Sequence, residues 1–136
     1  MTSVTLNAAR EAIYLRWATQ WAATTAYTFA NEAYSPPTDT AWARLVVSHD
    51  AGEQDSLGAP GNRKFMRRGR VLIQLYDIVD NGLRSLDLLA ATARTVFEGV
   101  QFSGLYFFSV DVRESGQDGE WYQLTVDAPF FYIETK

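Results

Sequence analysis

The feature of this sequence that most constrains its fold is a nearly continuous apolar run between Phe65 and Val79. Its apolar members in the second half are Val71, Leu72, Ile73, Leu75, Tyr76, Ile78 and Val79. β-Branched and aromatic residues are enriched in strands, and a strand without regular polar positions is typical of one that is covered on both faces. We therefore predict that residues 65–79 form a strand in the centre of a sheet, covered on both sides.

Two other segments repeat apolar residues at spacings of three and four, which predicts amphipathic helices. The first helix is expected from Ala8 to Ala23, with Asn7 as its N-cap. Its apolar positions are Leu6, Ala9, Ile13, Trp17 and Trp21. The second helix follows a turn at residues 80–82 and ends at Gly99, because glycine suits the left-handed position after a helix. Its apolar positions are Leu83, Leu86, Ala90, Ala93 and Phe97.

The remaining apolar segments predict shorter strands and one long hairpin. Strands are expected over residues 27–29 and 41–49. Apolar and polar residues alternate over residues 106–113 and again over 122–128, and glycines in residues 115–119 supply the turn of an antiparallel hairpin. The order helix, strands, helix, hairpin indicates the α+β class, with a mixed or antiparallel sheet of about five strands packed with two helices.

Composition supports one folded domain over residues 1–136. Hydrophobic residues make up 47% of the chain and aromatic residues 14%, which excludes a disordered chain because such chains lack apolar surface. The chain has no cysteine, which excludes a disulfide, a thiolate metal site and a cysteine nucleophile. It also has no apolar run of about 20 residues, and its first residues do not resemble a signal peptide. We expect a soluble protein that is made in the cytoplasm and has no membrane partner.

Charge is distributed unevenly along the chain. The net charge of −4 argues against a general nucleic-acid binder, which needs a basic surface. Within this acidic chain, residues 63–70 form a basic run that contains Arg63, Lys64, Arg67, Arg68 and Arg70. Three interpretations stay open: the charges protect an exposed strand edge, bind an acidic face of a neighbouring subunit, or contact DNA without sequence preference.

His49 is the only histidine, and it lies at the end of a predicted strand. With Asp50 it could act as a general base, and Ser48 or Ser56 could be the nucleophile. A histidine at such a position is more often a solvated or hydrogen-bonded surface residue, and we favour that interpretation. The sequence therefore predicts no catalytic residue.

The segment before the basic run, residues 50–62, is polar and predicts a long exposed loop. Asp50, Glu53 and Asp55 are spaced in a way similar to calcium loops, but the rest of that pattern is absent. The glycines of this loop resemble a phosphate loop only superficially, because Lys64 is not followed by Ser or Thr. The sequence predicts no metal ion and no cofactor.

The predicted hairpin is unusually rich in aromatic residues. Phe107 and Trp121 fall on the strand face that otherwise carries polar residues, so we predict that this aromatic surface contacts a partner. Asp118 and Glu120 lie at the predicted turn, where acidic residues most simply keep the turn in solvent.

Five segments, taken together, carry a resemblance to a known family. They are Ala9–Tyr14, Phe29–Pro37, Ala41–Leu45, Leu57–Phe65 and Glu114–Leu124. In these segments the chain resembles the tail-terminator, or minor tail completion, family of long-tailed phages and gene-transfer particles. The resemblance implies a structural virion protein and not an enzyme.

The resemblance also implies how such a subunit works. It assembles as a ring, typically a hexamer, on the last ring of the tail tube, stops the growth of the tube and joins the tail to the neck or head. Its partners are other copies of itself, the tail tube protein and a neck or head-completion protein, and its location is the tail–neck junction of the virion. A head-completion or neck connector protein of the same particle is the alternative.

A tube grows because each tube subunit has two different surfaces, one for the ring below and one for the ring above. A cap must therefore have the surface that binds the last ring and lack the surface that would bind a further ring. We expect the ring and tube contacts in the polar loop, the basic run and the hairpin turn, because identical subunits that meet head to tail can use opposite charges on different faces. The candidate contact residues are Asp50, Glu53, Asp55, Arg63, Lys64, Arg67, Arg68, Arg70, Asp118 and Trp121.

Overall fold

A computed structural model describes residues 3–50 and 52–136, which form two helices and one sheet of eight strands. In chain order the elements are α1 (Leu6–Trp21), β1 (Ala26–Phe29), β2 (Trp42–His49), β3 (Glu53–Gln54), β4 (Lys64–Ile78), α2 (Arg84–Phe97), β5 (Gln101–Phe102), β6 (Leu105–Phe107), β7 (Asp111–Asp118) and β8 (Trp121–Thr135). The predicted α+β class is confirmed, but the sheet has more strands than predicted. The strands β3, β5 and β6 have only two or three residues, which is too short to leave a periodic signal in the sequence.

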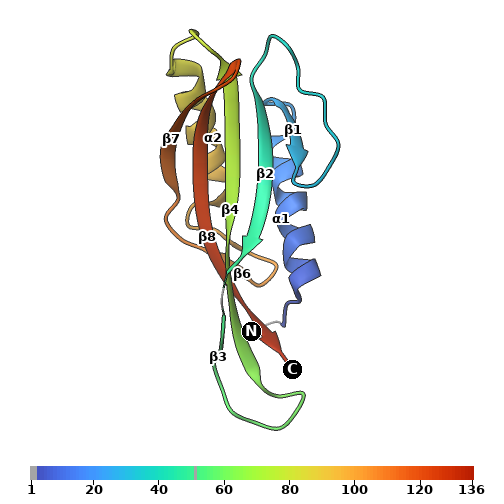
Figure 1. Ribbon diagram of the computed structural model, residues 1–136. Helices are drawn as coiled ribbons and strands as arrows, with labels where there is room; N and C mark the ends of the chain where they lie inside the picture. The colour runs from blue at the N-terminus through green and yellow to red at the C-terminus, as the bar shows by residue number, and fades with distance from the viewer. Residues whose placement is uncertain (1–2, 51) are drawn as a thin grey trace.

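β4 is the central strand of the sheet, as predicted. The strand order is β1-β2-β4-β8-β6-β5, with β3 also paired to β4 and β7 also paired to β8. β4 pairs antiparallel with β2 on one side, and on the other side it pairs with β8 over all of its 15 residues. In Figure 1, β4 and β8 run together along most of the length of the molecule. The β4–β8 pair is therefore the axis to which the other strands attach.

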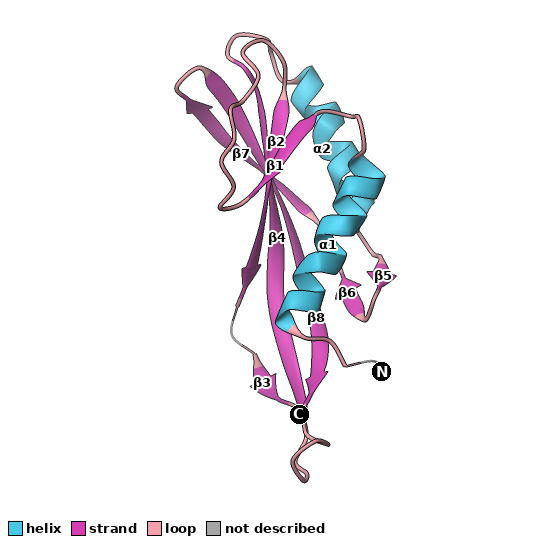
Figure 2. Ribbon diagram, turned by 90° about the vertical axis from the view of Figure 1, so that its right-hand side faces the viewer, coloured by secondary structure: helices cyan, strands magenta, loops and turns pink. Residues whose placement is uncertain are grey.

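Both helices lie on one face of the sheet (Figure 2). On that face β4 places Val71, Ile73 and Leu75, none of which has exposed surface. The predicted apolar stripes of the helices enter the same core through Ala9, Ile13, Trp17, Trp21, Leu86, Ala90, Ala93 and Phe97. Leu6 departs from the prediction, because its side chain is 50% exposed.

The prediction that β4 is covered on both faces is wrong. Within residues 3–50 and 52–136, no helix lies on the second face of the sheet, which we call the open face (Figure 2). One end of the open face is covered by aromatic rings: Trp42 stacks on Tyr76 with 4.3 Å between ring centroids, and Tyr34 and Trp121 pack against Trp42. Farther along β4, Leu72 is only partly buried. The apolar residues of β4 on this face suit a second covering layer, which the described residues supply only at the Tyr76 end.

α1 begins and ends two residues earlier than predicted. Its N-cap is Thr5 and not Asn7, because Thr5 Oγ1 accepts a hydrogen bond from the backbone N–H of Ala8 at 3.2 Å. Asn7 lies inside the first turn, where its side-chain amide donates to Glu11. The end of α2 agrees with the prediction, since Gly99 follows it with a left-handed φ of 65°.

The predicted strand over residues 106–113 is interrupted, which changes the direction of its side chains. β6 ends at Phe107, and before β7 begins the backbone N–H of Val110 donates to the carboxylate of Glu98 and not to a neighbouring strand. As a result Phe107 points into the core and is 4% exposed, while Phe108 is 55% exposed. The prediction that Phe107 contacts a partner is therefore wrong.

The hairpin of β7 and β8 is confirmed, but most of its predicted turn is strand. β7 continues through an irregularity between Glu114 and Gly116 and ends at Asp118. Only Gly119 and Glu120 lie between the two strands, and Gly119 takes the left-handed φ of 63° that the tight connection requires.

The lower ends of β4 and β8 extend beyond the helices together with β3 (Figure 1). We call residues 53–68 and 132–136 the β-arm. Reciprocal backbone hydrogen bonds between Arg63 and Lys136, at 3.0 and 2.8 Å, join the two segments of the arm near its tip. The predicted loop is thus partly ordered, because β3 pairs with β4. Residues 55–63 remain outside the strands, and we call them the tip loop.

Gly69 provides a test of how tightly the arm joins the body. A Cβ at this position would lie 2.5 Å from Ser48 O and 2.7 Å from Cζ of Phe130. We expect Gly69→Ala to lower the free energy of unfolding by about 1–3 kcal/mol, as overpacking usually does. Gly58→Ala is the matched control, because its nearest contact would be an ordinary 3.5 Å from Asn62 O. Equal urea midpoints for the two variants would contradict this close approach.

Candidate functional site

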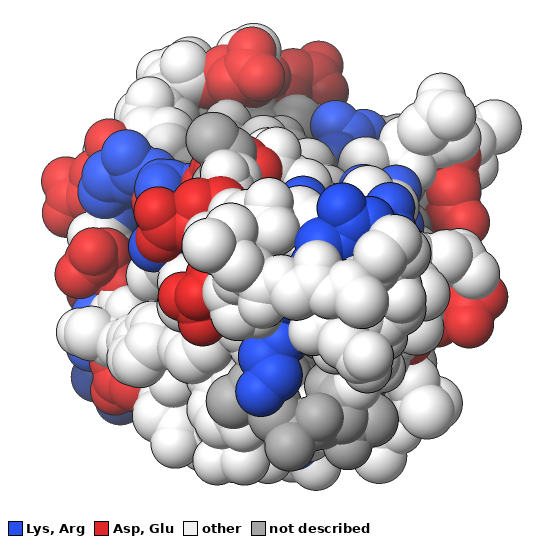
Figure 3. All heavy atoms as spheres, turned by 90° about the horizontal axis from the view of Figure 1, so that it is seen from below, with Lys and Arg blue, Asp and Glu red and all other residues white. Residues whose placement is uncertain are grey.

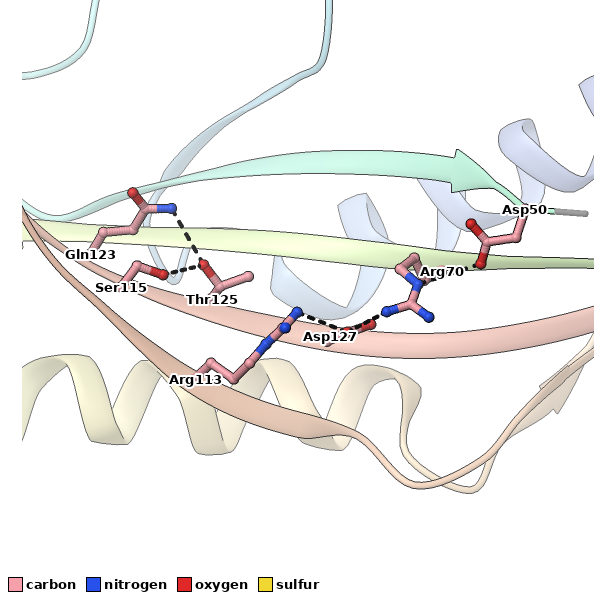
Figure 4. A network of polar contacts seen from close by, with 7 residues as sticks. All are labelled: Asp50, Arg70, Arg113, Ser115, Gln123, Thr125 and Asp127. Atoms are coloured by element: carbon pink, nitrogen blue, oxygen red, sulfur yellow. Dashed lines mark hydrogen bonds and ion pairs between the residues drawn. The ribbon is translucent and has the colours of Figure 1, made fainter.

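The open face carries a charged network where β4, β7 and β8 lie side by side (Figure 4). Asp127 of β8 is 7% exposed, and its Oδ2 accepts hydrogen bonds from Arg70 Nη1 at 2.8 Å and from Arg113 Nη2 at 2.9 Å. Arg70 Nε also lies 3.4 Å from Asp50 Oδ2. The network therefore links β8 to its two neighbours, β4 and β7, and extends to Asp50 after the end of β2.

The two arginines of this network keep part of their surface in solvent. The side chain of Arg70 is 42% exposed and that of Arg113 is 61% exposed. Asp127 Oδ1 is buried and has no hydrogen-bond partner among the described residues. Since two arginines meet two aspartates, the network has no net charge, but its exposed guanidinium groups can still donate to acidic or amide groups of a covering molecule.

A second set of polar contacts continues along β7 and β8 (Figure 4). The hydroxyl oxygens of Ser115 and Thr125 lie 2.8 Å apart, and Gln123 Nε2 donates to Thr125 Oγ1 at 3.4 Å. The β7–β8 side of the open face is therefore hydrophilic along its middle.

An aromatic stack lies on the open face near the base of the β-arm. Phe131 of β8 stacks between two rings, with centroid distances of 4.9 Å to Tyr106 and 5.5 Å to Phe108. Phe108 is 55% exposed, which is unusual for a residue of this size. Exposed aromatic rings beside half-exposed arginines have the composition of protein interfaces. The stack, not Phe107, is the aromatic surface available to a partner.

The basic run is largely paired with acidic residues of the same chain. Arg67 Nε lies 3.1 Å from Glu134 Oε1, and Arg68 Nη2 lies 2.9 Å from Glu53 Oε1. Arg70 belongs to the charged network described above. Seen from below, blue and red side chains are interspersed and do not separate into one basic patch (Figure 3).

These pairs bear on the three interpretations of the basic run. Protection of a free strand edge is less favoured, because β4 pairs with β8 throughout, with β3 at Phe65 and Met66, and with β2 from Gly69 onward. Attraction of DNA is weakened, since paired charges contribute less local potential. Contact with a neighbouring subunit remains. Arg63 and Lys64 form no ion pair within residues 3–50 and 52–136, and Lys64 is the more exposed of the two.

His49 is not the solvated residue that the sequence predicts. Both of its ring nitrogens are buried and have no hydrogen-bond partner in the described part of the chain. The ring packs edge-on against Phe130 and Tyr132, with 5.9 Å between centroids in each pair. Burial lowers the pKa of His49, and the Arg10 guanidinium lowers it further, while Asp50 opposes both effects. The neutral imidazole is therefore the form that the fold accommodates.

The predicted catalytic alternative finds little support in where its residues lie. Ser48 points to the face of β2 opposite His49, because adjacent residues of a strand alternate. Ser56 lies in the tip loop, and its hydroxyl accepts a hydrogen bond from the backbone N–H of Lys64.

The acidic residues with calcium-like spacing serve other contacts. Asp50 binds Arg70, and Glu53 binds Arg68. Among residues 3–50 and 52–136, no three His, Asp or Glu side chains are placed to share a metal ion.

The predicted contact residues divide between the two ends of the sheet. Asp118 and Trp121 form the last pair of the β7–β8 hairpin, while residues 53–68 of the predicted set lie at the opposite end, in the arm. Arg70 and Asp50 lie at the base of the arm. At about 3.3 Å per residue, the ends of the 15-residue strand β8 are separated by roughly 45 Å. Two distinct surfaces are available, so one subunit can meet different neighbours at its two ends.

Asp127 should contribute more to stability than an exposed acidic residue does. We expect Asp127→Ala to lower the free energy of unfolding by about 1–2 kcal/mol, because two charged hydrogen bonds are lost. Glu53→Ala is the control: its pair with Arg68 is 59% and 51% exposed, so its loss should cost less than about 0.5 kcal/mol. Chemical denaturation measures both values, and equal losses would show that the network is not a stabilising centre.

His49 makes stability depend on pH in a defined direction. Its folded-state pKa lies below the ordinary value of 6.5, so the unfolded chain binds the proton more readily. The stabilising contribution is complete above pH 6.5 and is lost as pH falls toward the folded-state pKa. His49→Phe should therefore lose less stability than the wild type between pH 7.5 and pH 5.5, measured by urea unfolding. Parallel losses in the two proteins would contradict a buried neutral His49.

No protein-family model matches the chain, and no curated protein is similar to it in sequence. One solved structure, of a protein designated only by a serial number, has a TM-score of 0.65 and 16% sequence identity. The alignment covers 93% of this chain and 96% of the other. No helix within residues 3–50 and 52–136 has the length and apolar character needed to cross a membrane. At this identity the similarity extends to the fold alone.

Proposed function

We propose that the protein is a structural subunit of a long-tailed phage or phage-like particle, and that its copies form a ring that caps the tail tube. The ring ends tube polymerisation and joins the tail to the neck or head. One observation carries this proposal: no helix in residues 3–50 and 52–136 covers the open face, which leaves Leu72 of β4 only partly buried and the ring of Phe108 55% exposed. A neighbouring molecule on this face would bury these apolar side chains.

The surfaces around the open face suit a subunit that meets unlike neighbours. The β-arm and the β7–β8 turn lie at opposite ends of the sheet, and their surfaces are formed by different residues. Contacts between unlike surfaces are heterologous, and they form a closed ring when the rotation from one copy to the next adds up to a full turn. A ring of this kind has two different sides, which a cap needs because only one side docks on the tube.

The tail-terminator role within this assembly class rests on the sequence resemblance. The segments Phe29–Pro37 and Leu57–Phe65, which carry part of that resemblance, correspond to the connection after β1 and to the tip loop that leads into β4. The hexamer, the tube partner and the neck partner follow from the same resemblance. A non-enzymatic role is consistent with charged residues that pair with one another along the sheet.

Deletion of the gene from the particle that encodes it tests the proposal. A terminator deletion should give tails of uncontrolled length, and the wild-type gene supplied in trans should restore a single length. Tails of normal length that lack heads would instead identify a neck connector. Infectious particles with normal tails would refute both roles.

The aromatic stack gives a matched pair of variants for the assembly itself. Phe108→Ser removes a 55% exposed ring from the open face, and Leu88→Ser removes a 59% exposed leucine from α2 on the other side of the sheet. Both residues lie largely outside the core, so both variants should fold with nearly wild-type thermal midpoints. We expect only Phe108→Ser to reduce ring formation on tail tubes, measured by electron microscopy. Equal ring yields would remove the open face from the assembly.

A further inference from the structure

The tip loop presents an apolar side chain at the end of the β-arm. Leu57 is 92% exposed, whereas the other exposed leucines are between 50% and 70% exposed. Its surroundings, residues 56–62, read Ser-Leu-Gly-Ala-Pro-Gly-Asn and carry no charge. The tip can therefore leave water without the large cost of burying an unpaired charge.

The tip loop is also preorganised by its own hydrogen bonds. Asn62 N donates to Ala59 O at 3.0 Å, with Pro60 and Gly61 between them and a φ of 94° at Gly61, as in a type II turn. At the base of the loop, Ser56 Oγ accepts a hydrogen bond from the backbone N–H of the first β4 residue at 3.1 Å. A loop that is ordered before binding loses less conformational entropy when it docks.

A groove of matching character lies along the outer side of α1. It has a volume of about 360 Å³ and is lined by Ser3, Val4, Ala8, Glu11, Ala12, Leu15 and Ser103, the last from the β5–β6 turn. Leu15 in this lining is 70% exposed. The lining combines small and apolar side chains with one acid, which suits a leucine and the small residues beside it.

The apolar character of this helix surface has a cause in the helix itself. The two arginines of α1 are directed toward the body: Arg10 Nη2 donates to Val47 O at 3.2 Å and Arg16 Nε donates to Val96 O at 2.6 Å. Both arginines are therefore engaged with the sheet and with α2. The outer surface of α1 therefore carries no positive charge at the groove: beside Glu11 it presents Ala8 and Leu15, which are exposed, and Ala12, which is partly exposed.

We infer that Leu57 of one copy docks into the α1 groove of the next copy. A second copy is the occupant because the tip loop points away from both helices and extends beyond the end of β8 (Figures 1 and 2). The charges at the two surfaces also match, since Lys64 at the base of the tip loop is exposed and Glu11 at the groove is exposed. The tip and the groove are different patches, so repetition of this contact is heterologous, as a ring requires. This inference rests on the proposed ring and assigns its lateral contact.

Disulfide crosslinking tests the contact cleanly, because the natural chain has no cysteine. The variant Leu57→Cys/Leu15→Cys is assembled on tail tubes, oxidised mildly and analysed on a denaturing gel. We expect a ladder that ends at the closed ring. The control Leu57→Cys/Leu88→Cys uses another exposed helical leucine, 59% against 70%, and should give no ladder. A mixture of the Leu57→Cys and Leu15→Cys single variants should give only dimers, since each copy then holds one thiol.

The outcomes separate this inference from the proposed function. Rings that control tail length but give no Leu57–Leu15 crosslink would overturn the docking contact and leave the terminator role intact. Ladders of equal strength from both double variants would also overturn it. Loss of crosslinking in Leu57→Cys/Leu15→Cys/Glu11→Lys, with restoration by Lys64→Glu, would support the paired charge at the groove. An absence of rings together with normal tails would refute both the contact and the role.

Discussion

The pairing of β4 with β8 is the interaction on which the rest of this structure depends. The 15 residue pairs of this ladder extend from the hairpin turn to the tip of the β-arm. β2 attaches to one side of the ladder, and β6 and β7 attach to the other. Because the two strands are antiparallel and in fixed register, the inward residues of both meet the helices and their outward residues share the open face. The core and the candidate assembly surface are thus two faces of one ladder.

The open face combines two kinds of surface that have different physical roles. Burying the aromatic and aliphatic side chains at its two ends against a partner would stabilise the complex, because removing apolar surface from water is favourable. The network around Asp127 lies between them and binds two arginines from neighbouring strands. Buried ionic groups often contribute little net stability, but their geometry can restrict which partner and which register are accepted. On this surface the aromatic rings provide apolar area for a partner to bury, and the charged network restricts how that partner is oriented.

Ion pairs within the chain neutralise much of the positive charge that the sequence concentrates in residues 63–70. In the sequence, five positive charges within residues 63–70 stand out from an acidic chain. In the structure, Arg67, Arg68 and Arg70 reach acidic residues from β8, β3 and the end of β2. The local electrostatic potential is therefore closer to neutral than the sequence suggests, and the β-arm is held together partly by these pairs. An uncharged tip on such an arm is suited to apolar docking more than to attraction of a polyanion.

Elements whose burial is local could be predicted from the amino-acid pattern. Periodic apolar positions were sufficient for the core stripes of both helices, and the apolar run was sufficient to place β4 in the centre of the sheet. The pattern could not show that both helices pack on the same face of β4, because this depends on where the helices attach to the sheet. The tertiary structure also decided that Phe108 faces outward, because a hydrogen bond to Glu98 breaks the strand. Ion pairs such as Arg67–Glu134 join residues far apart in the chain, and no local pattern can encode them.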